Sequence, residues 1–160
     1  MALEQIIEKW SGQVTTVTIG ATAEEGGTRT HSIQIGGEST LPFLFPEGAM
    51  PHKPQIAFEI WDSIPTEWPQ ELMKHYKDVA GDPFAWAQKC VKSYHASLLC
   101  VRLQGAHPDS GNKTPKEEAA FVAELIKKVG VPLILIGCGD DEKDNQILPL
   151  CSEALKGERC

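Results

Sequence analysis

The sequence predicts an α/β fold in which an N-terminal β-hairpin precedes parallel βα units. Three short apolar segments carry this prediction, and each is followed by a helical pattern: 55–62 (QIAFEIWD), 97–105 (SLLCVRLQG) and 132–139 (PLILIGCG). Strands that alternate with helices favour parallel pairing, because each crossover helix returns the chain to the same end of the sheet. The last strand runs into a glycine turn and an acidic helix start, and ligand sites of α/β folds lie at such strand ends.

The first third of the chain has a different pattern. Residues 14–19 and 30–35 alternate in β-branched character and flank the segment AEEGGTRT, in which Gly26 and Gly27 supply turn geometry. We therefore expect a β-hairpin with a long loop. Residues 36–54 are rich in Gly and Pro, which regular elements tolerate poorly, so they should form an irregular connector.

Helix starts are visible in the capping residues. Pro69 suits the first turn of a helix after the first apolar strand. Asp82 precedes Pro83, which combines an N-cap acceptor with a proline at the first helical position. Thr114 and Glu117 form a capping-box pattern, in which a hydroxyl and a carboxylate bind otherwise unpaired amide groups. These positions predict helices between the strands.

The last helix should begin at Asp140, since acidic residues are stabilised by the positive end of a helix dipole, and Pro149 should interrupt it. An eight-stranded barrel typically needs about 250 residues. We therefore expect one domain, residues 1–160, with the hairpin and connector in 1–54 and the βα units of about half a TIM barrel in 55–160. A small open sheet is the alternative. The open edges of a half-barrel invite pairing with a partner or with further chain.

Composition excludes several classes of protein. The 160 residues are 41% hydrophobic with a formal net charge of −7, which is typical of a globular chain with one core. Lys and Arg do not cluster, so no nucleic-acid partner is expected. The N-terminus lacks the features of a signal peptide and no membrane span is visible, so we expect a cytoplasmic protein with reduced thiols. The five cysteines have no CxxC or Cys/His spacing, and no metal site is predicted.

Four segments together resemble one known family. They are residues 20–37 (GATAEEGGTRTHSIQIGG), 41–43 (LPF), 82–91 (DPFAWAQKCV) and 131–149 (VPLILIGCGDDEKDNQILP). Over nearly its whole length the chain resembles the N-terminal half of the small (delta) subunit of the corrinoid iron–sulfur protein, part of the acetyl-CoA decarbonylase/synthase system. Members of that family run about twice as far, as a whole barrel requires.

The resemblance implies a TIM barrel that forms a heterodimer with a large corrinoid iron–sulfur subunit, with a corrinoid (cobalamin) held between the two. In this family the iron–sulfur cluster lies on the large subunit. The complex carries a methyl group from a methyl-tetrahydropterin to acetyl-CoA synthase in the reductive acetyl-CoA (Wood–Ljungdahl) pathway, with the methyltransferase and acetyl-CoA synthase as transient partners. We expect a non-catalytic or weakly catalytic subunit, because the cofactor does the chemistry while the protein positions it.

Candidate corrinoid contacts lie where the predicted strands end, since the functional face of such barrels is at the carboxyl ends of the strands. They are Asp62, Gln104, Gly105, His107, Gly137, Cys138, Gly139 and Asp140. Several also have a structural interpretation. The two glycines at 137 and 139 can serve only the strand-to-helix turn, Asp140 can be a helix cap, and Cys138 can be a small buried hydrophobe. No catalytic residue is assigned.

Other interpretations stay open. Related barrels bind methyl-tetrahydrofolate through Asp and Asn residues at strand ends, so a pterin-binding methyltransferase barrel that uses Asp62, Asp140 and Asn145 is the alternative function. An inactive fragment of either is a third possibility. Residues 28–31 (TRTH) combine a guanidinium with hydroxyls that could hold an anion, although a hairpin contact or subunit docking is favoured for such a loop.

Overall fold

The structure, a computed structural model, describes residues 4 and 6–160. The described residues form two compact units, one made of residues 4, 6–18 and 33–55, the other of residues 19–32 together with 56–160. The second unit holds the parallel sheet and its helices. It therefore contains the strand ends at which the sequence predicts a site.

The predicted hairpin is present. β1 (Val17–Ile19) and β2 (Ile33–Ile35) pair as a two-stranded sheet, and backbone hydrogen bonds between Val14 and residues 37–38 extend the pairing. Both strands are shorter than the predicted segments. Residues 36–54 form the expected irregular connector, interrupted by the 3-10 helix η2 (Pro42–Glu47).

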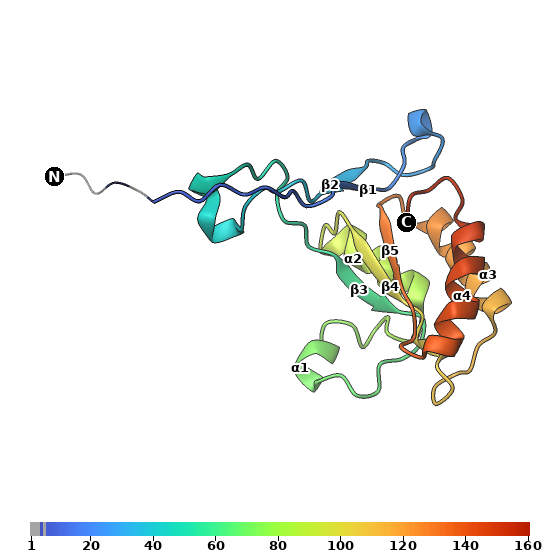
Figure 1. Ribbon diagram of the computed structural model, residues 1–160. Helices are drawn as coiled ribbons and strands as arrows, with labels where there is room; N and C mark the ends of the chain where they lie inside the picture. Colours follow the sequence, from blue (N-terminus) through green and yellow to red (C-terminus); the bar gives the residue numbers. More distant parts are fainter. Residues whose placement is uncertain (1–3, 5) are drawn as a thin grey trace. The chain divides into compact units, whose positions relative to one another are not determined.

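Three parallel strands form the sheet of the second unit (Figure 1). They are β3 (Phe58–Trp61), β4 (Leu99–Arg102) and β5 (Leu133–Ile136), in the order β3-β4-β5. Phe58 pairs with Leu99 and Leu99 with Leu133, so the carboxyl ends of the three strands lie along one edge of the sheet. The parallel βα arrangement predicted from the sequence is confirmed.

Helices follow every strand of this sheet. α1 (Gln70–Met73) and α2 (Pro83–Ser93) follow β3, the 3-10 helix η3 (Gln104–Ala106) and α3 (Pro115–Lys128) follow β4, and α4 (Asp141–Ala154) follows β5. Crossing a bilayer would require a longer and more apolar helix than any in the described part of the chain.

The capping residues begin the helices as predicted. Asp82 Oδ1 accepts hydrogen bonds from two backbone N–H groups in the first turn of α2. At α3, Thr114 Oγ1 accepts from Glu117 N while the Glu117 carboxylate accepts from Thr114 N at 2.7 Å. These reciprocal contacts occupy amide groups that the first helical turn leaves unpaired.

α4 differs from the prediction at Pro149. The helix continues through this residue to Ala154 instead of ending there. Proline removes the hydrogen bond to the carbonyl of Asn145, four residues earlier. Both residues are exposed, so water can bind that carbonyl, and the helix is retained by its buried face, which includes Ile147 and Cys151.

The core lies between the helices and one face of the sheet. The sheet contributes Leu99, Val101 and Leu133, which are fully buried. The helices contribute Trp86 of α2 and Val122 of α3, which are also fully buried. Burial of these large apolar side chains stabilises the parallel sheet, whose strands are short.

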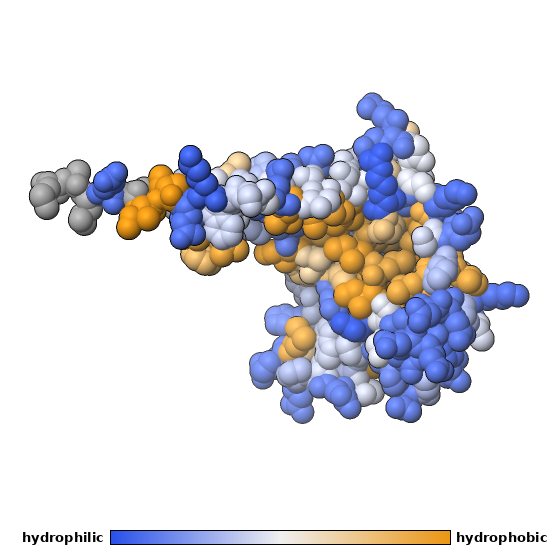
Figure 2. Space-filling view, viewed as in Figure 1, coloured by the Kyte–Doolittle hydropathy of each residue, from blue (hydrophilic) through white to orange (hydrophobic). Residues whose placement is uncertain are grey.

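The other face of the sheet mixes charge with apolar groups. Side chains alternate along a strand, so the register places Glu59, Trp61, Arg102, Ile134 and Ile136 on this face. Arg102 Nε lies 3.0 Å from Glu59 Oε1, and the Arg102 guanidinium lies 5.9 Å from the centre of the Trp61 ring. Figure 2 shows apolar side chains gathered over the region of these strands.

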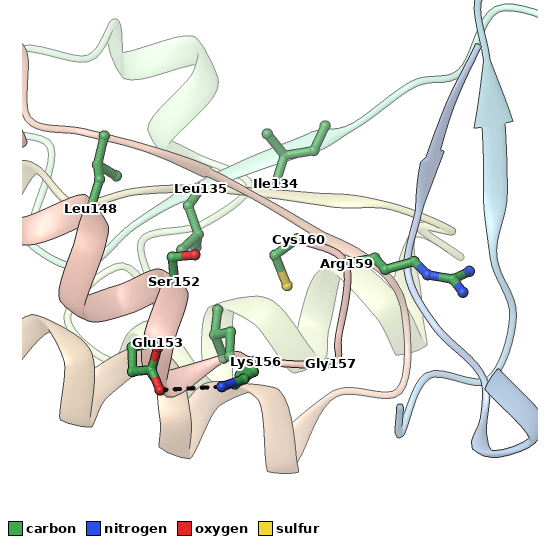
Figure 3. A pocket seen from close by; sticks show the side chains of 10 residues that line it. Ile134, Leu135, Leu148, Ser152, Glu153, Lys156, Gly157, Arg159 and Cys160 are labelled. Carbon is green, nitrogen blue, oxygen red and sulfur yellow. Dashed lines mark ion pairs between the residues drawn. The ribbon is translucent and has the colours of Figure 1, made fainter. Parts of the chain in front are cut away.

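A groove of about 630 Å³ lies between β5 and the end of α4. Figure 3 shows the side chains of Leu135, Leu148 and Cys160 lining it, with the ion pair of Glu153 and Lys156, 3.8 Å apart, on the α4 side. Within the described residues, β5 pairs with β4 alone and β3 likewise pairs with β4 alone. Unpaired strand edges of this kind are normally covered in a native protein.

Candidate functional site

The carboxyl ends of β3 and β4 frame a cleft of about 760 Å³. One wall is the segment that leaves β3, residues 61–67, and the other is the turn that leaves β4, residues 104–111. Of the residues predicted from the sequence, Gln104 and His107 line this cleft, and Trp61 lies beside them. The cleft is therefore at the edge of the sheet where a parallel α/β fold places its ligands.

Asp62 and Gly105 lie directly against each other. Asp62 is 6% exposed, and its Oδ1 accepts a hydrogen bond from Gly105 N at 2.7 Å. A β-carbon on Gly105 would lie only 2.4 Å from Asp62 Oδ2, so the approach requires glycine. The structure thus brings two predicted residues together, and packing around a buried carboxylate explains the glycine.

Two charged residues that the sequence pattern did not single out complete this cluster. Lys113 Nζ donates to the carboxylate of Asp62 and, at 3.0 Å, to its backbone oxygen. Glu118, near the start of α3, is 0% exposed, and its Oε1 lies 3.9 Å from Lys113 Nζ. Burial, followed by the hydrogen bond and charge of Asp62, raises the pKa of Glu118 to about 8. The available indication was spacing, because Glu118 lies four residues before the buried Val122 on the apolar face of the helix.

Gln104 and His107 belong to the turn that this cluster holds. His107 N donates to Gln104 O at 3.1 Å, which closes the turn. His107 Nδ1 accepts a hydrogen bond from Asp109 N at 3.1 Å, so Nε2 carries the hydrogen of the neutral imidazole. Both side chains are half-buried at the cleft and can hydrogen-bond to a polar ligand.

Gly137, Cys138 and Gly139 form a loop around the carboxylate of Asp144. The two oxygens of Asp144 accept hydrogen bonds from Cys138 N at 2.7 Å and from Gly139 N at 3.0 Å. Burial opposes ionisation, but these hydrogen bonds outweigh it and lower the pKa of Asp144 below its ordinary value. A β-carbon on Gly137 would lie 2.2 Å from Asp144 Cγ, and Gly139 has φ +92°, so both positions suit glycine.

Cys138 and Asp140 also have structural contacts of their own. The Cys138 thiol is 4% exposed, and burial raises its pKa, which is typical of an unreactive cysteine. Asp140 Oδ1 accepts a hydrogen bond from Lys143 N at 2.9 Å and caps α4. His107 is among the groups that lower the pKa of Asp144, so the turn after β4 and the loop after β5 are neighbours.

The residues of the alternative pterin site do not converge on the cleft. The Asp62 carboxylate is bound by Gly105 and Lys113, Asp140 caps α4, and Asn145 is exposed further along that helix. Residues 4 and 6–160 contain no group of three His, Cys, Asp or Glu side chains placed to hold a metal ion.

Comparison with known proteins gives one consistent answer. Residues 16–160 match the family model for the CO dehydrogenase/acetyl-CoA synthase delta subunit. The chain is 37% identical over 153 residues to the acetyl-CoA decarbonylase/synthase complex subunit delta of Archaeoglobus fulgidus, with 95% of this chain and 33% of that protein covered. It is 34% identical over 157 residues to subunit delta of Methanocaldococcus jannaschii, with 98% and 38% covered.

Subunit delta of Methanothermobacter thermautotrophicus is 36% identical over 154 residues, with 96% of this chain and 38% of that protein covered. The chain therefore spans about a third of the length of these relatives. These matches confirm the resemblance seen in the sequence motifs. Because the family model covers nearly the whole chain, the chain belongs to the CO dehydrogenase/acetyl-CoA synthase delta subunit family.

Proposed function

We propose that this chain contributes the corrinoid-covering part of a methyl-carrier complex, which passes a methyl group from a methyl-tetrahydropterin to acetyl-CoA synthase in the reductive acetyl-CoA pathway. Membership of the delta subunit family supports the assignment to this system. The structural observation that carries the proposal is the cleft at the carboxyl ends of β3 and β4. In parallel α/β folds, cofactors bind at this end of the strands.

The walls of the cleft suit a corrinoid. Ser63, Thr66, Gln104 and Ser110 present hydroxyl and amide groups, which can hydrogen-bond to the amide side chains around a corrin ring. Trp61 adds an aromatic surface with an apolar body. The corrinoid supplies the methyl-transfer chemistry when bound, while the protein orients it and excludes water.

The predicted strand-end residues take two roles in this proposal. Gln104 and His107 contact the corrinoid directly, because their side chains line the cleft. Asp62 and Gly105 hold the turn that carries them. The loop after β5 forms the neighbouring rim, and we assign to it the remaining candidates Gly137, Cys138, Gly139 and Asp140.

A larger barrel is part of the proposal. Sequential parallel strands with a helix after each are the repeating unit of a TIM barrel, and the unpaired edges of β3 and β5 leave room for further strands. The longer relatives have about three times the length of this chain, which is enough for a whole barrel. We propose that additional βα units continue the sheet from these edges.

The proposed partners follow from the methyl-carrier role. The large corrinoid iron–sulfur subunit forms the other half of the corrinoid site and carries the iron–sulfur cluster, in a cytoplasmic heterodimer. A methyltransferase and acetyl-CoA synthase bind transiently to deliver and receive the methyl group. The chain itself then needs no acid, base or nucleophile. The carboxylates of Asp62 and Asp144 next to the cleft are engaged in hydrogen bonds, and Glu67 and Asp109 add negative charge to its walls.

Co-elution of this chain with the cobalamin-loaded large subunit tests the proposal. On a sizing column, corrin absorbance and both proteins should elute together. The double variant Gln104→Ala with His107→Ala should weaken the complex by on the order of tenfold or more, since each lost hydrogen bond is worth about 1 kcal/mol. Gln88→Ala is the matched control, because Gln88 is a half-buried polar residue on α2, away from the strand ends.

Two outcomes would contradict the proposal. Separate elution of the coloured large subunit would show that this chain does not by itself cover the corrinoid. Tight binding of methyl-tetrahydrofolate to the isolated chain in equilibrium dialysis would favour the pterin-binding barrel instead.

A further inference from the structure

Glu118 is buried in a way that an ionised carboxylate tolerates poorly. It is 0% exposed, and neither of its carboxyl oxygens has a hydrogen-bond donor among the residues that the structure describes. The ammonium of Lys113 lies 3.9 Å away, too far for a hydrogen bond, and it already donates to Asp62. A buried anion without a donor is strongly destabilising.

Protonation of Glu118 removes this conflict. The protonated carboxyl becomes a donor, and its hydrogen bond goes to the carboxylate of Asp62. Asp62 can accept it, because a carboxylate has about four lone-pair sites and Gly105 N and Lys113 Nζ occupy only some of them. One bound proton therefore satisfies a buried group that has no other hydrogen-bond partner among the described residues.

Four groups face Glu118: Asp62 after β3, Lys113 before α3, Glu117 on α3 itself and Cys151 on α4. The negative charges of Asp62 and Glu117 favour the neutral form of Glu118, and the ammonium of Lys113 opposes them. Burial raises the pKa of the Cys151 thiol to about 12, so that group stays neutral. With Glu118 protonated, Asp62 and Lys113 balance each other in charge. Ionisation of Glu118 would leave a second negative charge in a place closed to solvent.

We propose that Glu118 is a positioning residue that keeps a proton at neutral pH and thereby fixes, through Asp62, the turn that carries Gln104 and His107. The connection is continuous. Asp62 binds the backbone of Gly105 at 2.7 Å, and Lys113, bound to Asp62, donates from its own backbone N–H to Gly105 O at 3.0 Å. Both ends of the 104–113 turn are thus bound to the Asp62 carboxylate, which accepts the hydrogen bond from protonated Glu118.

Loss of the proton should loosen this turn. As the pH rises through the raised pKa of Glu118, about 8, two adjacent carboxylates share one lysine, and their repulsion weakens the contact of Asp62 with Gly105. The walls of the cleft on the β4 side then become less ordered. This inference holds whatever molecule the cleft binds, so it can fail or succeed independently of the corrinoid proposal.

NMR of the chain labelled with ¹³C at the Glu carboxyls and with ¹⁵N at Gly tests the inference. One Glu carboxyl should titrate near pH 8, and the Gly105 amide signal should move with the same midpoint. In Glu118→Gln both changes should disappear while the turn stays ordered, because the amide still donates to Asp62 without titrating. Glu124→Gln, an exposed residue of the same helix, is the control and should leave both changes intact.

Either of two results would overturn the inference. The first is that every Glu carboxyl titrates below about pH 6, close to its ordinary range. The second is that the Gly105 signal shifts with the same midpoint in Glu118→Gln as in the unmodified chain, which would assign the change to another group. Glu118→Ala should show a disordered turn at every pH, and if that variant fails to fold, Glu118→Gln still decides the question.

Discussion

Arg29 and Glu158 form an ion pair at 3.0 Å that joins the loop after β1 to the segment that follows α4. Arg29 is 4% exposed, and its guanidinium also donates to three backbone oxygens, those of Ile126, Val129 and Val131. Two of these carbonyls lie at the end of α3, where the helix dipole favours a cation. All three guanidinium nitrogens are engaged by the protein, so residues 28–31 make a hairpin contact instead of holding a free anion.

Replacing Arg29 by Ala should lower the free energy of unfolding by about 3–5 kcal/mol, because it removes the cationic partner of Glu158 and the guanidinium donor of three buried carbonyls. Arg29→Lys should recover only part of this loss, since an ammonium lacks the planar fork of the guanidinium. Urea unfolding measures the difference. The control is Arg159→Ala, which removes an exposed ion pair with Glu25 and should cost less than about 1 kcal/mol. Equal losses of unfolding free energy for the two alanine variants would show that the Arg29 contacts stabilise the fold no more than an exposed ion pair does.

Gly105→Ala should disturb the cleft. The added carbon would lie 2.4 Å from Asp62 Oδ2 and 2.8 Å from the Lys113 side chain, so both must shift. We expect a loss of about 1–3 kcal/mol in the free energy of unfolding and broadened NMR signals in the 104–113 turn. Gly81→Ala serves as the comparison, because its nearest contact is an ordinary 3.9 Å to Ile64. That variant should change stability by no more than about 0.5 kcal/mol.

Local sequence rules predicted the elements well because each rests on a contact between near neighbours. The Thr114 and Glu117 capping box and the Asp82 cap before Pro83 form within three residues, and α3 and α2 begin where these residues stand. The hairpin and the three buried strands follow from side-chain periodicity in the same way. Parallel pairing then placed the strand ends, and with them the cleft, along one edge of the sheet.

Contacts between distant segments were not predictable from such rules. The sequence places Asp62 at a strand end, but its partner Lys113 is 51 residues away. Glu118 lies on the apolar face of α3, and only the fold shows that a second carboxylate lies beside it. The local effect of Pro149 on the backbone predicts an interrupted helix, whereas packing of the buried face of α4 retains the helix through this residue.

Asp144→Asn should loosen the loop after β5. The amide cannot replace both oxygens, so either Cys138 N or Gly139 N loses its acceptor, at a cost of about 1–3 kcal/mol. Because the pKa of Asp144 is lowered in the folded chain, the stability that its ionised form contributes is present above its ordinary pKa of 3.8 and is lost as the pH falls below it. Asp141→Asn, at an exposed position in the first turn of α4, should cost less than about 1 kcal/mol. A similar loss of unfolding free energy in both variants at neutral pH would contradict the stabilising role of the hydrogen bonds that Asp144 accepts from the loop.

Glu118 should make the chain less stable as the pH rises toward 8. Its pKa is raised from an ordinary value of 4.5 to about 8, so the folded chain holds a proton that the unfolded chain has lost between those values. The stability contributed by the protonated form is complete below pH 4.5 and declines as the pH approaches 8. Between these two pH values, the free energy of unfolding of Glu118→Gln should rise relative to that of the unmodified chain by up to about 1.4 kcal/mol for each pH unit.

Urea unfolding of both proteins between about pH 5 and about pH 9 measures this difference. The variant keeps the hydrogen bond to Asp62 but has no proton to lose, so titrations elsewhere in the chain cancel in the comparison. Above the raised pKa the difference should level off, because Glu118 is then ionised in both the folded and the unfolded state. A difference that stays constant across the whole pH range would mean that Glu118 has the same pKa in the folded and the unfolded state. The buried carboxylate would then need a hydrogen-bond donor other than the groups that surround it in this structure.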